Sequence, residues 1–269
     1  MMDINPLKNI TTTTLAVLTL ASHILFSQSL LATQALPEFN AKYGIEKFGI
    51  KAAEATYQLS YTDKGYKFVQ NTKLTGIAKV FNSSTVSAVS GVDKVGDNLL
   101  LTNYEYVRTG SKKDRNEKLS ILWNTHKNML RGEITGTVRG KKVKLTTDSE
   151  IWEILSFQIP LMIEANQTVK EYPYKAILKG KINTYNFVLS ATKKIRFAGK
   201  PYQAIELVRT DPHKDRQLRI WLIPKLHNIP VIIENHKDGD LDSLMRLERV
   251  QFNSEKPFIG DTDNDDDDF

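Results

Sequence analysis

Hydrophobic and polar residues alternate with a period of two over most of the chain, and turn residues interrupt the alternation about every eight to twelve positions. Residues 66–74 show the pattern most clearly, directly after the turn Asp63-Lys64-Gly65. A strand with one buried and one solvated face produces this alternation. The strands predicted in this way cover residues 41–50, 53–61, 66–74, 84–91, 99–108, 118–123, 129–136, 142–146, 168–178, 182–191, 202–209, 217–223, 229–235 and 241–252.

These strands predict a mainly β fold: a single antiparallel β-barrel or half-barrel of about a dozen strands. So many strands in one sheet normally curl, and curling into a barrel removes most of the exposed sheet edges. A barrel wider than eight strands is not filled by its own side chains alone. We therefore expect a helix or a ligand to fill the interior.

One segment departs from the period of two. From Asp148 to Ala165, apolar residues recur at spacings of three and four, which predicts a helix over about 148–165. Thr147 and Glu150 have the spacing of a capping box at its start, and Pro160 is expected to kink or divide it near its end. This helix either plugs the barrel as part of the core or forms a lid over an apolar cavity. In the second case its apolar side chains bind the ligand: Trp152, Leu155, Ile159 and Met162.

The N-terminus is typical of a secretory signal peptide, residues 1–35. Lys8 precedes an apolar stretch over about residues 15–31, and the small residues Thr33 and Ala35 have the spacing that signal peptidase requires. We expect cleavage after about Ala35 and export to the bacterial periplasm. An uncleaved membrane anchor is the alternative, because the apolar run is longer than a minimal signal requires.

The C-terminus is predicted to be a disordered acidic tail, residues 256–269, which follows a β-barrel-like domain at residues 36–255. The tail holds six aspartates, and removing them from the formal charge of +6 leaves the rest of the chain near +12. The domain itself is therefore strongly basic. Its basic runs lie at turns and strand edges, at residues 112–115, 139–144 and 193–196.

Lysines at strand edges often only protect a sheet from aggregation. The functional alternative is attraction to an anionic membrane surface. For that case we predict contact with an anionic headgroup through Lys193, Lys194 and Arg196. Nucleic acid fits the charge but not the export signal, and no aromatic-rich RNA-binding motif is present, so no nucleic-acid partner is expected.

No sequence pattern points to an enzyme. The chain has no cysteine, which excludes a cysteine nucleophile and a thiolate metal site, and it has neither a nucleophile-elbow motif nor a phosphate-binding loop. Carboxylates and a histidine at residues 211–215 are typical of a turn between strands. We therefore predict no catalytic residues, no metal and no cofactor. Carboxylate pairs that meet only in space are invisible to this reasoning.

The order of strand and turn motifs over residues 148–250 resembles an exported bacterial family, domain of unknown function 3108 (DUF3108), and 43–45 is similar to the family's opening strand. The motifs are Asp148-Ser149, 174–179, the hairpin at Gly180-Lys181, 185–189, 197–200, 204–207, 219–222, 229–234 and 244–250. The resemblance implies a periplasmic, largely antiparallel β-barrel-like domain whose general shape is similar to the lipoprotein carriers of the envelope. An acidic residue common in the family is absent here, where the turn 224–228 stands.

Together these observations predict a periplasmic, non-catalytic binding or carrier protein for an amphipathic ligand, with a lipid as the first candidate, in the bacterial cell envelope. An envelope scaffold without a small-molecule ligand, which engages an unknown partner protein, is the first alternative. A hydrolase acting on envelope polymers is the second.

Overall fold

The computed structural model describes residues 35–81, 84–110, 114–126, 129–210, 215–253 and 258–259. All of its elements belong to the unit at residues 34–269. The predicted signal peptide and most of the predicted acidic tail lie outside the described residues. The strands are β1 (Phe39–Lys47), β2 (Ile50–Tyr61), β3 (Gly65–Leu74), β4 (Thr85–Val95), β5 (Asn98–Arg108), β6 (Glu117–His126), β7 (Met129–Val138), β8 (Lys141–Thr147), β9 (Glu171–Leu178), β10 (Lys181–Phe197), β11 (Lys200–Thr210), β12 (Arg216–Ile223), β13 (Ile229–Lys237), β14 (Asp240–Phe252) and β15 (Phe258–Ile259).

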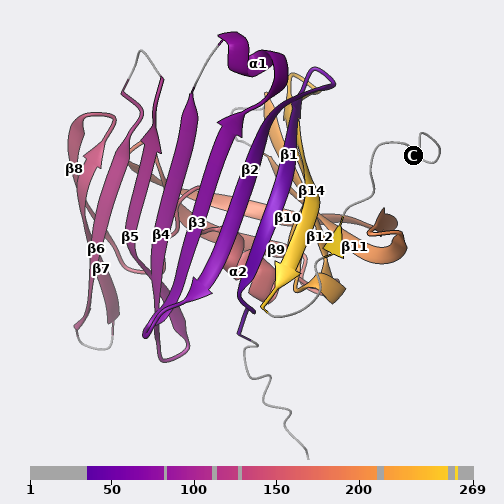
Figure 1. The fold of residues 1–269 in the computed structure, drawn as a ribbon. Coiled ribbons are helices and arrows are strands. Elements are labelled where there is room, and N and C mark those ends of the chain that lie inside the picture. Colours follow the sequence, from indigo (N-terminus) through magenta and orange to yellow (C-terminus); the bar gives the residue numbers. More distant parts are fainter. Residues whose placement is uncertain are drawn as a thin grey trace, which may run out of the picture. The chain divides into compact units, whose positions relative to one another are not determined.

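The strands form one antiparallel sheet, and its two end strands, β8 and β9, do not pair with each other (Figure 1). Its order is β8-β7-β6-β5-β4-β3-β2-β1-β14-β13-β12-β11-β10-β9, and β15 pairs with β14 off this path. Strands that follow one another in sequence pair, except that β8 and β9 stand at the two ends of the sheet, and β14 returns to lie beside β1. The predicted half-barrel of antiparallel strands is confirmed. The short β15 lies within the range predicted as a tail, so the sheet extends further along the chain than expected.

Five hairpins share the same two-residue turn, a non-glycine residue followed by glycine, both with positive φ. Such a pair belongs to the type I′ turn, whose twist matches that of paired strands. These turns are Phe48-Gly49, Arg139-Gly140, Lys179-Gly180, Ala198-Gly199 and Asp238-Gly239. Only the aspartate belongs to the residue types that favour the first position.

The core follows from the predicted alternation. On β2, the side chains of Ala53, Ala55, Tyr57 and Leu59 are buried, while most of the residues between them are not. An aromatic contact links this face of β2 to β1: the ring centroids of Tyr57 and Tyr43 lie 5.1 Å apart. One connected hydrophobic cluster extends from β1 to β14 and includes the segment between β8 and β9.

The predicted helix over 148–165 is much shorter in the structure. Only α2 (Gln158–Glu164) is an α-helix, and residues 154–157 before it form turns. Pro160 therefore lies in the first turn, where a missing N–H costs nothing, and it does not divide the helix. The capping box is wrong as well: the Thr147 hydroxyl donates to the carbonyl of Ser149, and Glu150 accepts from the distant amide of Leu99.

Two short helices were not predicted: α1 (Gly76–Phe81), between β3 and β4, and the 3-10 helix η1 (Pro224–Leu226), between β12 and β13. No helix among the described residues has the length and apolar character that a membrane crossing requires.

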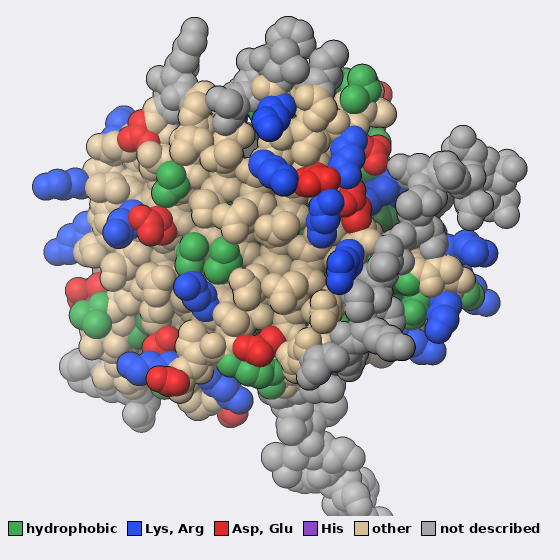
Figure 2. Space-filling view, viewed as in Figure 1, with side chains coloured by type: hydrophobic (Ala, Val, Ile, Leu, Met, Phe, Trp, Pro, Cys, Tyr) green, Lys and Arg blue, Asp and Glu red, His purple; other side chains and the backbone are tan. Residues whose placement is uncertain are grey.

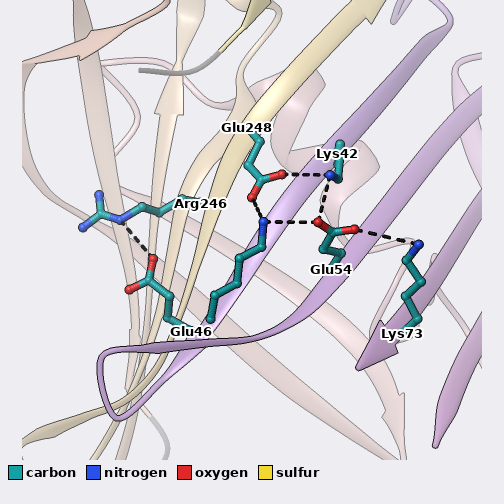
Figure 3. A network of polar contacts seen from close by, with 7 residues as sticks. Lys42, Glu46, Glu54, Lys73, Arg246 and Glu248 are labelled. Carbon is teal, nitrogen blue, oxygen red and sulfur yellow. Dashed lines mark hydrogen bonds and ion pairs between the residues drawn. The ribbon is translucent and has the colours of Figure 1, made fainter. Parts of the chain in front are cut away.

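Ion pairs cover the solvated face where β14, β1 and β2 adjoin (Figure 3). Glu54 pairs with Lys42 at 2.9 Å and with Lys51 at 3.2 Å, and Glu248 pairs with both lysines. The hydrogen bond from Lys42 holds the pKa of Glu54 below its usual value. Blue and red side chains lie side by side on this face in Figure 2. Because the pairs are partly exposed, each contributes little to stability.

Candidate functional site

The candidate site lies in the gap between β8 and β9, the two end strands of the sheet. We call residues 148–165, which cross this gap between β8 and β9, the seam segment. At its start, Asp148 pairs with Lys175 of β9 at 2.7 Å. Trp152 then donates its amide to the carbonyl of Lys175 at 3.0 Å and accepts from the amide of Ile177 at 2.8 Å. This one parallel bridge is the ladder contact that joins the seam segment to β9 in the described chain.

The seam segment fills the interior of the curved sheet. The structure places the four side chains predicted to bind a ligand in one buried cluster, with exposed fractions between 0% and 3%: Trp152, Leu155, Ile159 and Met162. Next to them, the Phe157 ring stacks on Phe187 of β10 with ring centroids 5.5 Å apart. In this conformation the segment is packed as a plug, and its apolar side chains take the place that a ligand would need.

A buried carboxyl group anchors the middle of the seam segment. Glu153 is 1% exposed, and its oxygens accept hydrogen bonds from the Ser90 hydroxyl of β4 and from the amides of Leu155 and Ser156 at 2.7 Å and 2.8 Å. Burial raises the pKa of Glu153, although these donors act in the opposite direction. The carboxyl group thus caps the turn at 154–157 and ties it to β4.

A second cluster of polar side chains, Glu150, Glu164 and Tyr174, lies where the seam segment begins and ends. The Tyr174 hydroxyl of β9 donates to Glu164 at 2.9 Å, and Glu150 is close enough for its charge to act on Tyr174 and for the charge of Glu164 to act on it. Desolvation raises the pKa of Glu150 and of Glu164, and the charge of Glu164 adds to the effect on Glu150. These are two carboxyl groups held near each other that favour the protonated form more than free glutamate does.

The C-terminal end of α2 is held by Asn228, from the turn at 224–228. Its side-chain amide donates to the carbonyls of Met162 at 3.0 Å and Ala165 at 2.9 Å. Asn228 has a φ of 52°, a left-handed conformation that asparagine tolerates better than most residues. The turn therefore serves as a C-terminal cap for a helix that lies far away in the sequence.

The predicted headgroup residues lie together on β10 but do not share one face. Side chains alternate along a strand, so Lys194 and Arg196 point to one side and Lys193 to the other. Lys193 lies over the ring of Trp221 on β12, with its Nζ 4.5 Å from the centroid. All three are exposed.

Sequence reasoning missed the residues that hold the seam segment, namely Ser90, Glu153 and Asn228. Ser90 and Glu153 are 63 positions apart, and Asn228 and Met162 are 66 apart. No local spacing could connect them. A serine on a strand and a glutamate in an apolar run were the only visible signals, and both are common in soluble domains.

The comparisons with known proteins agree with this geometry. The sequence model of the family described as "Protein of unknown function (DUF3108)" matches residues 38–245. The chain belongs to the DUF3108 family. Among solved structures, it is similar to the crystal structure of a β-barrel-like protein of domain of unknown function DUF1849 from Brucella abortus, with a TM-score of 0.52 and 8% sequence identity. That match covers 82% of this chain and 99% of the other.

At this identity the likeness shows the fold alone, and it supports the β-barrel-like architecture of this DUF3108 protein. No curated protein matches the chain.

Proposed function

We propose that this DUF3108 protein is a non-catalytic carrier that binds an amphipathic lipid of the bacterial cell envelope in the periplasm. The observation that carries the proposal is the open sheet with the seam segment packed in its gap. A fully paired barrel has no such opening. Here the apolar interior is reached by moving one stretch of chain, with no ladder broken between neighbouring strands.

Replacing the seam side chains in the interior by a lipid acyl chain should cost little free energy. Leu155, Ile159 and Met162 pack against other apolar side chains, and an acyl chain in their place would offer the same kind of surface. Because one apolar surface replaces another, the net change in buried apolar area is small. The main polar contacts that hold the segment and would have to be released are these: the Asp148–Lys175 ion pair, the Leu99–Glu150 hydrogen bond, the Trp152 bridge, the Glu153 cap, the Tyr174–Glu164 hydrogen bond and the Asn228 cap.

The charged end of the ligand would lie at the surface. Lys193, Lys194 and Arg196 remain our candidates for contact with an anionic headgroup, because they are exposed and belong to the strand next to the end strand β9. The Trp221 ring beneath Lys193 holds that side chain against the sheet. The other two side chains lie on the opposite side, so we expect Lys194 and Arg196 to act as a pair.

The test locks the seam. The chain has no cysteine, so Asp148→Cys with Lys175→Cys creates one pair that a short, cleavable thiol cross-linker can join across the gap. The control is Lys47→Cys with Asp242→Cys, which replaces a 3.0 Å ion pair between β1 and β14, away from the seam segment. Binding of a fluorescent fatty acid is measured before and after cleavage of the linker.

We expect the locked seam to lose binding, cleavage to restore it, and the control to bind throughout. Equal binding by locked and cleaved protein would overturn the proposal that the seam segment moves. Absence of binding in every form would overturn lipid carriage itself.

A second candidate, hydrolysis of an envelope polymer, is favoured by the group of Glu150, Glu164 and Tyr174. A carboxyl group with a raised pKa can act as a general acid beside a second carboxylate. In that case purified protein would cleave peptidoglycan fragments, and Glu150→Gln would abolish turnover while leaving the fold intact. Glu171→Gln, at an exposed position of β9, is the matched control.

A further inference from the structure

Three connections lie together at one end of the gap between β8 and β9. They are the β7–β8 turn at 139–140, the β9–β10 turn at 179–180 and the described part of the β5–β6 connection at 114–116. A methyl group on Gly180 would lie 3.2 Å from Val143 Cγ1 of β8, so the β9–β10 turn lies against the strand that follows the β7–β8 turn. The amide of Arg139 donates to the carbonyl of Asn116 at 2.8 Å, which joins the third.

These connections carry a concentration of basic side chains, which we call the basic mouth. Its six members are all exposed: Arg115, Arg139, Lys141, Lys142, Lys179 and Lys181. Two acidic residues lie among them. Glu117 is 3.8 Å from Arg139, and a methyl group on Gly140 would lie 3.2 Å from the carboxylate of Asp114. The described part of the basic mouth keeps a net charge of about +4 when these are subtracted.

Two of these basic residues have an unfavourable backbone conformation. Arg139 and Lys179 each have a φ of 54°, in the left-handed region that suits asparagine, aspartate and glycine. Both residues stand at the tip of a type I′ turn, where asparagine would relieve the strain.

We infer that the basic mouth is a docking surface for an anionic lipid bilayer. Its bases lie in three connections and at the strand ends beside them, all at one end of the sheet, and most of them are lysine. Flexible point charges of this kind suit a plane of mobile phosphates better than one fixed anion. The surface lies at the end of the gap that the seam segment crosses, so docking would bring that gap to the membrane. The inference goes beyond carriage and does not depend on what the interior binds.

The experiment measures co-sedimentation of the full-length protein with vesicles. The probes are mixed phosphatidylglycerol–phosphatidylcholine vesicles and pure phosphatidylcholine vesicles, at low and high salt. The test variant joins Lys141→Gln, Lys142→Gln, Lys179→Gln and Lys181→Gln. The control joins four substitutions of exposed lysines at the opposite ends of the strands, with the same change in net charge: Lys64→Gln, Lys94→Gln, Lys200→Gln and Lys225→Gln.

We expect binding to anionic vesicles only, weakened by salt. The mouth variant should lose a hundredfold or more in partitioning, on the order expected for four lysines, and the control should lose far less. An equal loss in both variants would mean that net charge alone acts, and absence of wild-type binding would also overturn the inference.

A second variant separates docking from folding. Arg139→Asn with Lys179→Asn relieves the two strained turns, so it should unfold at a higher urea concentration than wild type and still bind anionic vesicles less well. Unchanged binding in this more stable protein would contradict the inference. Failure of lipid carriage would instead appear as absence of fatty-acid binding in solution, with vesicle docking intact.

Discussion

Replacing Ser90 with alanine tests the anchor of the seam segment. Ser90 is fully buried on β4, and its hydroxyl donates to Glu153. A hydrogen bond to a charged or partly charged group contributes about 1.5–3 kcal/mol, and the buried carboxyl oxygen keeps few other partners. We therefore expect Ser90→Ala to lower the free energy of unfolding by about 2 kcal/mol.

The effect should be concentrated in the seam segment. The amides of Leu155 and Ser156 both donate to the same carboxyl group, so a loosened Glu153 exposes them more often. If the local opening carries the full cost, their hydrogen exchange should become about 30-fold faster. Urea unfolding measures the global effect, and exchange followed by mass spectrometry measures the local one.

Thr102→Val is the matched control, because it removes a partly buried hydroxyl that donates to the neutral carbonyl of Gly91 at 3.1 Å. It should cost about 1 kcal/mol and leave exchange at Leu155 and Ser156 unchanged. The reasoning is refuted if Ser90→Ala costs less than about 0.5 kcal/mol, or if its effect on exchange does not exceed that of the control.

Two further variants test the anchors of the seam segment. Burial raises the folded-state pKa of Glu153. Its contribution to stability therefore declines as pH rises from the ordinary glutamate pKa through the raised one. In Glu153→Gln, the urea midpoint should decline less steeply between about pH 4 and about pH 8. An unchanged slope would show that Glu153 titrates normally. Asn228→Gly keeps the left-handed backbone accessible but removes two hydrogen bonds to the end of α2, so it should cost about 2 kcal/mol in urea unfolding. A cost near zero would mean that water replaces the cap.

The strands were predictable because their pattern is local. Ala53, Tyr57 and Leu59 alternate with polar neighbours, and that alternation alone sets the buried face of β2. The glycines at 140 and 180 likewise marked their hairpins, because both turns need a positive φ. The antiparallel half-barrel then follows, since short turns can join only neighbouring antiparallel strands.

The seam segment was harder, because its apolar residues recur at helical spacing although only 158–164 form an α-helix. Trp152, Leu155 and Ile159 have helical spacing, yet Trp152 pairs with β9 and residues 154–157 form turns. Its contacts with Ser90 and Asn228 join residues more than 60 positions apart. The sequence could therefore indicate that this segment fills the interior, and could not indicate how it is held there.

The most direct test of the proposed lipid carriage is mass spectrometry of small molecules extracted from the predicted mature protein, residues 36–269, purified from its native cells without detergent. Our account predicts one lipid species in stoichiometric amount, and the Asp148–Lys175 cross-link should prevent its loading. A protein that carries no lipid and shows the seam segment packed in every molecule would contradict it.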